Sequence, residues 1–252
     1  MILIVFIFGI VIGSFLNVCI YRLPKSKSIV YPGSYCPYCK HKIKWRHNIP
    51  VLSYIFLRGR CAYCSEKISS RYIFVELLSG LFTALAFFKF GFTAEFIFYL
   101  LLIYSLIVIS FIDFDLHLIL NKNLLVLLIM AVLLNALFKI VDWQEGLIGL
   151  LTGGGILLLF SFLGKSLFKK ESMGMGDVKF AAVLGFFLGW EWVVVVLYCG
   201  FVLALLYSVF RNLIRNSEKS RYIPMAPFFS LATLLFIFYG EQLSRLYLQH
   251  FV

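Results

Sequence analysis

Apolar runs of about 20 residues recur along the whole chain, and they constrain its fold more than any other feature. Of the 252 residues, 62% are hydrophobic and only 14% are charged, and the mean hydropathy is +0.96. These values lie outside the range of soluble globular proteins. Because about 20 apolar residues can cross a bilayer as a helix, the sequence predicts an all-α polytopic membrane protein.

We expect about eight transmembrane helices, the sixth being the shortest. The first lacks the basic start and the cleavage site of a signal peptide, so we expect a retained span. The run 180–210 is interrupted only by Glu191, and we expect it to form a hairpin that turns at Gly189–Trp192. The expected spans are 2–21, 73–90, 96–112, 123–140, 146–164, 178–190, 192–210 and 226–246.

The distribution of basic residues predicts the topology. Of the 23 Lys and Arg residues, 20 fall in four loops on one side of the alternating spans: 22–72, 113–122, 165–179 and 211–225. Since Lys and Arg concentrate in cytoplasmic loops, we expect these loops inside and both termini outside. This topology and attraction to anionic headgroups explain the net charge of +11. The bilayer is therefore the expected partner of the basic loops, and no nucleic acid is expected.

Four cysteines in the first long loop form two C-x-x-C pairs, Cys36 with Cys39 and Cys61 with Cys64. The 21 residues between the pairs are one more than the usual range for a four-cysteine zinc site. A loop with little apolar core needs a cross-link to stabilise its fold. Zinc can supply folding energy where a reducing cytoplasm prevents disulfides. We expect structural zinc, and the alternatives are a redox dithiol and a loop without metal.

Three carboxylates lie where apolar runs meet polar loops. Asp113 and Asp115 occur in FIDFDLHLILN, and Asp177 occurs in GMGDVKF. An aspartate at the bilayer centre costs about 2.5–3.5 kcal/mol on insertion scales, so acids at the edge of a span indicate function. On a continuous helix Asp113 and Asp115 point about 200° apart. We therefore expect one of them to take part in the reaction and the other to have a supporting role. Glycines at 174 and 176 allow the backbone to come close to another segment and to aim Asp177 across the site.

Polar residues in or beside the first two spans need partners. Asn17, in GSFLNVCIYRLP, is expected to join helices through its amide. Arg22 and Pro24 are expected to end the first span at the interface. Glu76, in SSRYIFVELLSG, is five residues from Arg71, which is too far for an ideal i,i+4 pair. We therefore expect Glu76 to face a protein interior, a headgroup or a bound ligand.

These patches, in this order, resemble the type IV prepilin peptidases, the membrane leader peptidases of pilus, type II secretion and competence systems. The resemblance covers nearly the whole chain and includes IPMAPFF at 223–229. It implies that one aspartate of I-D-x-D and one of G-x-G-D, here Asp113 and Asp177, form an aspartic protease pair. The supporting positions that it implies are Asp115, Gly174, Gly176 and Lys179. The family has proline seven residues after the first aspartate, whereas this chain has Leu120.

The resemblance also implies a substrate, a cofactor and a location. The substrate would be a prepilin-like precursor with a short basic leader and an apolar helix, cut after a glycine. Many members of the family then methylate the new N-terminal residue with S-adenosylmethionine, an activity of the amino-terminal half. Asn17, Arg22 and Glu76 are the positions carried over to that activity. The location would be the inner membrane of a bacterial cell, with the active site and the basic loops facing the cytoplasm.

We expect three regions: a first transmembrane helix at 1–21, a cytoplasmic zinc loop associated with methylation at 22–72, and a transmembrane peptidase at 73–252. Two other classes of function fit parts of the chain. An ion-coupled transporter would use the acids as a relay, but it predicts acids near mid-bilayer and an internal repeat. A membrane scaffold would bind a partner through the zinc loop, with the acids capping helices.

Overall fold

The computed structural model describes residues 1–168, 173–214 and 223–251. Within these ranges the regular structure is helical, and extended pairing is limited to two isolated bridges in the first long loop. The chain divides into two compact units, Met1–Phe96 and Ile97–Val252. Five of the basic residues assigned to cytoplasmic loops lie outside the described residues: Lys169, Lys170, Arg215, Lys219 and Arg221.

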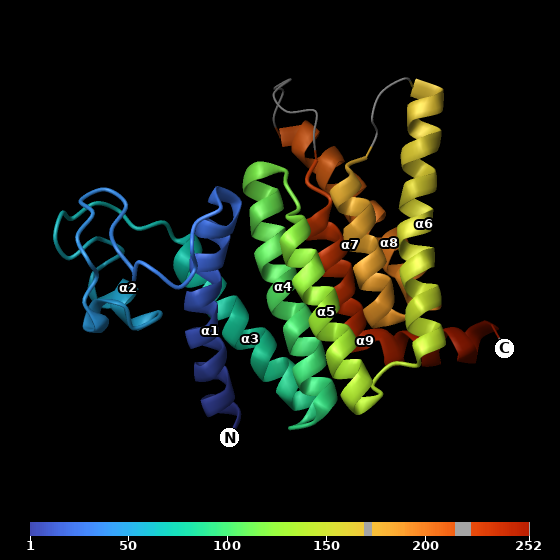
Figure 1. Cartoon of the computed structure of the whole chain (residues 1–252), viewed down its shortest axis with the longest axis horizontal. Helices are drawn as coiled ribbons and strands as arrows, with labels where there is room; N and C mark the ends of the chain where they lie inside the picture. Colours follow the sequence, from blue (N-terminus) through green and yellow to red (C-terminus); the bar gives the residue numbers. More distant parts are fainter. Residues whose placement is uncertain (169–172, 215–222, 252) are drawn as a thin grey trace. The chain divides into compact units, whose positions relative to one another are not determined.

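In the described part of the chain, eight long helices lie where the apolar runs predict them, and the all-α expectation is confirmed (Figure 1). Six of them are long and apolar enough to cross a membrane, so the chain is a multi-pass membrane protein. The six are α1 (Ile2–Arg22), α3 (Arg71–Phe90), α4 (Ala94–Leu116), α5 (Asn121–Phe138), α6 (Trp143–Phe168) and α8 (Trp190–Ile214).

The other two long helices leave the expected count of eight spans unconfirmed. Helix α7 (Met175–Leu188) has 14 residues and rises about 21 Å, less than the roughly 30 Å of a bilayer core. In α9 (Ala226–Phe251), only Ala226–Gly240 counts as an apolar helix, and it is below the length of a span. The expected hairpin turn is confirmed, because α7 ends at Leu188 and Gly189 takes φ 80° before α8 begins.

In the first unit, small residues allow α1 and α3 to pack closely. A Cβ added at Gly9 or Gly13 of α1 would overlap α3, at Thr83 and at the backbone of Glu76 respectively. Such small residues let helix backbones approach in a membrane, where water does not drive association. The loop between α1 and α3 contains only short helices: η1 (Leu23–Lys25), η2 (Trp45–His47) and α2 (Leu52–Phe56).

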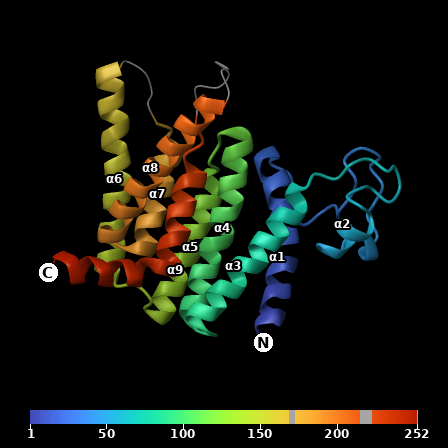
Figure 2. The same ribbon diagram turned by 180° about the vertical axis from the view of Figure 1, so that it is seen from behind.

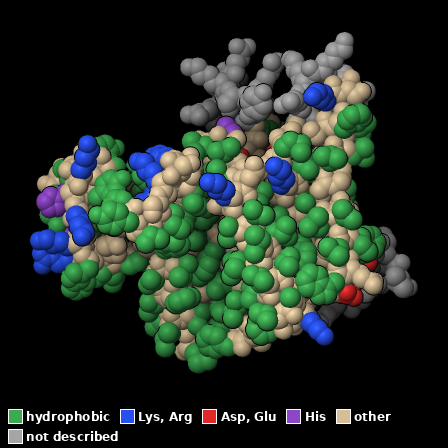
Figure 3. All heavy atoms as spheres, in the orientation of Figure 1, with side chains coloured by type: hydrophobic (Ala, Val, Ile, Leu, Met, Phe, Trp, Pro, Cys, Tyr) green, Lys and Arg blue, Asp and Glu red, His purple; other side chains and the backbone are tan. Residues whose placement is uncertain are grey.

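In the second unit, α7 is enclosed by its neighbours, and this places its polar first turn among other helix ends. Nearly every residue from Val178 to Leu188 is buried, and α7 contacts α5, α6, α8 and α9. The contact with α6 is closest at Gly149 and Gly185, whose added Cβ atoms would each overlap the other helix's backbone. Figure 2 shows these helices from behind, and Figure 3 shows hydrophobic side chains covering the face of the helices in view.

Candidate active site and metal centre

Four helix ends meet in the second unit, and each contributes to one polar cluster. Asp113 lies one turn from the end of α4, Asp177 is the third residue of α7, and Asn121 and Ala226 begin α5 and α9. The first N–H groups of a helix have no partners within it. The starts of α9 and α7 therefore each supply a backbone donor to one of the two carboxylates.

Asp113 is buried and bonded to the backbone of α9. Its side chain is 5% exposed, and its Oδ2 accepts a hydrogen bond from the N–H of Ala226 with a donor–acceptor distance of 3.0 Å. Helix α4 continues for less than one turn beyond it, because His117 takes φ 51°. The N–H of His117 closes this turn by donating to the Asp113 carbonyl at 2.8 Å.

Asp177 occupies the first turn of α7, where its carboxyl accepts a hydrogen bond from the N–H of Gly174, the residue that caps the helix. Burial and the nearby charge of Asp113 outweigh this bond and raise the pKa of Asp177 to about 6. Helix α4 packs against α7 at Phe98 and Phe187, and the two carboxyls are near enough for the charge of Asp113 to act on Asp177. The two residues are therefore far apart in the sequence but lie on neighbouring helices, α4 and α7.

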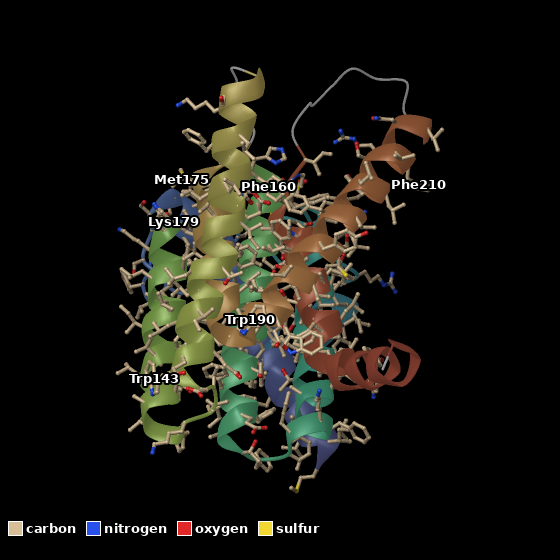
Figure 4. The ribbon with its side chains drawn as sticks, turned by 90° about the vertical axis from the view of Figure 1, so that its right-hand side faces the viewer. Trp143, Phe160, Met175, Lys179, Trp190 and Phe210 are labelled. Atoms are coloured by element: carbon tan, nitrogen blue, oxygen red, sulfur yellow. The ribbon has the colours of Figure 1, made fainter. Side chains whose placement is uncertain are left out.

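The GMGD turn approaches the α4–α5 connection closely. A Cβ added at Gly176 would lie 3.0 Å from the Cβ of Ile119, so a larger residue would push the turn away. On the next turn of α7, Lys179 Nζ donates to Asn121 Oδ1 at 3.0 Å. In Figure 4, Met175 and Lys179, which flank Asp177, lie toward the end of the helices opposite Trp143. Lys179 thus ties α7 to α5 next to the carboxylate pair.

Asp115 and Leu120 stand apart from the pair. The Asp115 side chain is exposed although Asp113 is buried, in agreement with the expected angle between them on α4. Leu120 caps α5 with φ −78° and ψ 116°, which is within the range that a proline ring imposes on φ. The chain therefore adopts the backbone expected of the family's proline without having the proline.

The four cysteines of the first unit form one cluster. Their sulfur atoms all lie within 4.8 Å of one another, and the Cys36 and Cys64 sulfurs are 3.8 Å apart. A tetrahedral zinc with bonds of about 2.3 Å requires sulfurs about 3.8 Å apart, whereas a disulfide requires about 2.05 Å. The donor set therefore fits a metal ion, and a four-thiolate set is typical of structural zinc.

The two cysteine pairs lie on turns of the same kind. In each turn the first cysteine donates its N–H to a carbonyl five residues on, from Cys36 to His41 at 3.0 Å and from Cys61 to Glu66 at 2.8 Å. The residues that follow the second cysteines, Lys40 and Ser65, have left-handed backbones, with φ of 58° and 59°. Backbone N–H groups of Cys64 and Tyr63 lower the pKa of Cys61 to about 7, whereas burial and the neighbouring sulfurs raise the pKa of Cys64 to about 12.

Asn17, Arg22 and Glu76 are all buried in the first unit, and each has partners within the chain. Asn17 donates to the Tyr72 carbonyl at 3.0 Å, which joins α1 to α3. Arg22 donates to two carbonyls of the following loop, at Ser28 and Gly33. Glu76 Oε2 accepts the Val51 N–H at 2.8 Å and is also hydrogen-bonded to Ser14. Together they hold α1, α3 and the loop in place.

The sequence did not indicate that Ala226 would belong to the site. In IPMAPFF, Pro224 and Pro227 indicate only where the last helix begins, because proline interrupts regular structure. Proline near the start of a helix marks a first turn whose N–H groups are unpaired. That signal indicates an available donor, but it does not identify the acceptor 113 residues earlier.

Comparison with known proteins decides the family. Residues 7–90 match the bacterial peptidase A24 N-terminal domain, and residues 100–209 match the type IV leader peptidase family. The prepilin leader peptidase/N-methyltransferase of Aeromonas hydrophila is 34% identical over 98% of this chain and 94% of its own. The chain belongs to the type IV leader peptidase family.

Other relatives of the chain agree over most of its length. The proteins of the same name from Pseudomonas aeruginosa and Legionella pneumophila are 32% and 31% identical, covering 96% and 100% of this chain and 91% and 96% of their own. No solved structure matches it. The expected family and the expected enzyme class, a membrane peptidase, are thereby confirmed. Both aspartates of the pair lie in the second matched range and the four cysteines in the first.

Proposed function

We propose that the chain removes the short basic leader of prepilin-like precursors, using Asp113 and Asp177 as its catalytic pair. The observation that carries the proposal is the meeting of helix ends at the two carboxyls, with Asp113 bonded to the start of α9 and Asp177 in the first turn of α7. The charge of Asp113, added to burial, raises the pKa of Asp177 to about 6. Two carboxylates that interact in this way readily share one proton, because both cannot easily be ionised together.

A pair with one proton can hydrolyse a peptide bond without a covalent intermediate. The ionised carboxylate takes a proton from water as the water oxygen attacks the scissile carbonyl carbon, and the protonated carboxyl donates to the carbonyl oxygen. Because the two carboxyls interact, they titrate as a unit. In this scheme neither Asp115, which is exposed, nor Lys179, which donates to Asn121, exchanges a proton with the substrate.

The proposed site faces the cytoplasm of a bacterial cell, at the inner membrane. The described basic residues near it, Lys122 and Lys179, belong to the loops and helix starts that the charge distribution assigns to the inside. A precursor whose apolar helix lies in the bilayer would present the junction with its leader at the depth of Asp113 and Asp177. The basic leader itself would remain in the cytoplasm.

We propose that the four cysteines hold one structural zinc ion. The residues that would bind it are Cys36, Cys39, Cys61 and Cys64, whose sulfurs are already gathered within 4.8 Å of one another. When bound, zinc would supply folding energy to a loop that has little apolar core.

We also propose that the chain methylates the new N-terminal residue, because its relatives are named N-methyltransferases. S-adenosylmethionine would supply the methyl group. Asn17, Arg22 and Glu76 would support this activity by fixing α1, α3 and the loop, because their contacts are to carbonyl, N–H and hydroxyl groups of the chain.

The catalytic assignment is tested by replacing each aspartate with asparagine, which keeps the size but removes the shared proton. Asp113→Asn and Asp177→Asn should each lower the rate of precursor cleavage by at least about 100-fold, the lower end of general acid–base effects. Asp115→Asn is the matched control and should lose much less. Cleavage by purified protein in nanodiscs would be followed by mass spectrometry of the released leader. Normal cleavage by either of the first two variants would show that the pair is not catalytic.

A further inference from the structure

The first long loop carries a short apolar helix, α2, that neither the catalytic pair nor the cysteine cluster uses. Its side chains Leu52, Ile55 and Phe56 are each more than half exposed. We propose that α2 lies in the bilayer leaflet on the loop's side of the membrane, with these three side chains among the lipid acyl chains. The partner of this surface is therefore lipid, and the loop is not wholly in water.

Hydrogen bonds to the two long helices of the first unit set the depth of α2. Val51, the residue that caps α2, donates its N–H to Glu76 Oε2 on α3 at 2.8 Å. Glu76 is in turn hydrogen-bonded to Ser14 of α1, and a Cβ added at Gly13 would lie 2.8 Å from the Glu76 Cα. The start of α2 therefore lies at the level of Ser14 and Glu76.

This level is well inside the ends of both helices. Helix α1 ends at Arg22, eight residues after Ser14, and α3 begins at Arg71, five residues before Glu76. At 1.5 Å per residue these intervals are about 12 Å and about 7.5 Å. Each helix is about 30 Å long, which only just matches the apolar core of a bilayer, so its ends lie near the edges of that core. The start of α2 thus lies below the edge, and Figure 1 shows α2 beside α1, between its two ends.

The polar side chains of α2 bond to the protein, whereas most of its apolar side chains point away from it. Ser53 is buried and its Oγ donates to the Arg46 carbonyl at 3.2 Å. The Tyr54 hydroxyl donates to the Ile68 carbonyl at 3.4 Å. A cluster of large exposed apolar side chains marks an interaction surface, and at this depth the surrounding medium is lipid. The exposed side chains of the cluster are Leu52, Ile55 and Phe56.

The segments that flank α2 suit the headgroup region. Arg46, Arg58 and Arg60 are exposed on either side of it, and residues 22–65 include no acidic residue. Basic side chains attract anionic headgroups. Trp45 is also exposed, and tryptophan is enriched where the membrane meets water. An apolar segment between basic flanks is typical of helices that lie in the interface with their apolar side buried by about 5–10 Å. The bonds to Glu76 and Ser14 give a similar depth.

The test places a single tryptophan at residue 56 or at residue 31. Phe56→Trp and Tyr31→Trp are matched variants, because the two native rings are 81% and 80% exposed. Tyr31 lies between Ser28 and Gly33, whose carbonyls accept hydrogen bonds from Arg22 at the end of α1. Residue 31 is therefore expected outside the apolar core. Both variants are made in a chain whose four native tryptophans are replaced: Trp45→Phe, Trp143→Phe, Trp190→Phe and Trp192→Phe.

The protein is placed in nanodiscs that contain anionic lipid. Lipids brominated in their acyl chains should quench Phe56→Trp at least about twofold more strongly than Tyr31→Trp, because burial by about 5–10 Å brings the ring among the bromines. Iodide in the water should show the opposite order. Equal quenching of the two variants by brominated lipid would overturn the proposal. Protection of residue 56 from both quenchers would also overturn it, because protein rather than lipid would then cover α2.

A second measurement uses the unaltered protein and does not depend on how the variants fold. A photoactivated carbene reagent that dissolves in the bilayer labels side chains that lipid surrounds. Trypsin cuts after Lys and Arg, and it releases residues 28–40, which contain Tyr31, and residues 47–58, which contain α2. Residues 47–58 should carry more label than residues 28–40, and equal or weaker labelling would contradict the proposal. Neither measurement uses precursor cleavage, so failure of the proposed peptidase function would appear separately.

Discussion

Glu76 on α3 and Val51 in the preceding loop are joined by a hydrogen bond of 2.8 Å from the Val51 N–H to Glu76 Oε2. Val51 has φ 61°, a value that β-branched residues rarely adopt. Glu76 thus accepts from a backbone that is held in an unfavourable conformation. The buried acid of α3 fixes the start of α2 within the same unit.

Replacing this acid should release the loop while leaving the carboxylate pair intact. Glu76→Ala removes the acceptor of the Val51 N–H, and a hydrogen bond of this kind contributes about 0.5–1.5 kcal/mol. Backbone amides of residues 49–57 should exchange faster in Glu76→Ala, measured by hydrogen–deuterium exchange in nanodiscs. Glu76→Gln keeps an oxygen acceptor on a side chain of the same size, so its exchange rate for this segment should lie between those of the unaltered protein and Glu76→Ala. Equal protection of this segment in all three proteins would contradict the positioning role.

Zinc content should depend on the cysteine cluster alone. The purified protein should contain one zinc per chain by elemental analysis, and Cys61→Ser should lose most of it because one of four ligands is gone. Removing the metal with a chelator should make residues 23–70 sensitive to protease, since the loop has little other support. Cys199→Ser is the control, because Cys199 is an exposed residue of α8. A redox dithiol would instead give a protein without zinc whose cysteines form disulfides on oxidation.

The titration of Asp177 should respond to Asp113. Burial and the Asp113 charge raise the pKa of Asp177 from 3.8 to about 6. Asp113→Asn removes the second cause and keeps the first, so the pKa of Asp177 should fall below about 6 yet stay above 3.8. The carboxyl ¹³C shift of labelled Asp177 would follow it. In the unaltered protein, the raised value means that Asp177 contributes stability below pH 3.8 that is lost as the pH rises through about 6.

Hydrophobic runs sufficed to predict the helices, because each span must satisfy its own backbone in the bilayer. They did not settle the number of crossings. Helix α7 has an apolar sequence like that of a span, yet it stops after 14 residues at Gly189. Its apolar residues are buried by protein, and hydropathy does not distinguish a helix enclosed by neighbours from one enclosed by lipid.

The site was predictable where side chains carry the chemistry. The cysteine spacing predicted the cluster, and the two acidic motifs pointed to Asp113 and Asp177. The backbone donor at Ala226 was not predictable, because every residue except proline has an N–H and only the fold shows which one meets Asp113. The partners of Glu76 were missed for the same reason, since Val51 also contributes its backbone.

Leu120→Pro should restore the family's residue without loss of activity. Leu120 already has φ −78° and precedes the first turn of α5, so the ring fits the backbone conformation. Proline at a compatible position stabilises by about 0.4–1 kcal/mol, because it restricts the unfolded chain. Precursor cleavage should be unchanged, and the melting temperature should be equal or slightly higher. A marked loss of cleavage would show that the α4–α5 connection must change conformation during the reaction.

The packing of α7 against α6 should be sensitive to a single methyl group. Gly149→Ala would place a Cβ against the Gly185 carbonyl, whereas Gly155→Ala, on the same helix, would place one where no atom lies within 4 Å. Both changes give the same gain in helix propensity, about 0.5–1 kcal/mol, so their difference isolates the contact. Overpacking costs about 1–3 kcal/mol, and Gly149→Ala should therefore melt at the lower temperature by tryptophan fluorescence. Because α7 carries Asp177, Gly149→Ala should also slow precursor cleavage, whereas Gly155→Ala should leave it unchanged. Equal melting temperatures in the two variants would mean that α6 and α7 can separate without cost.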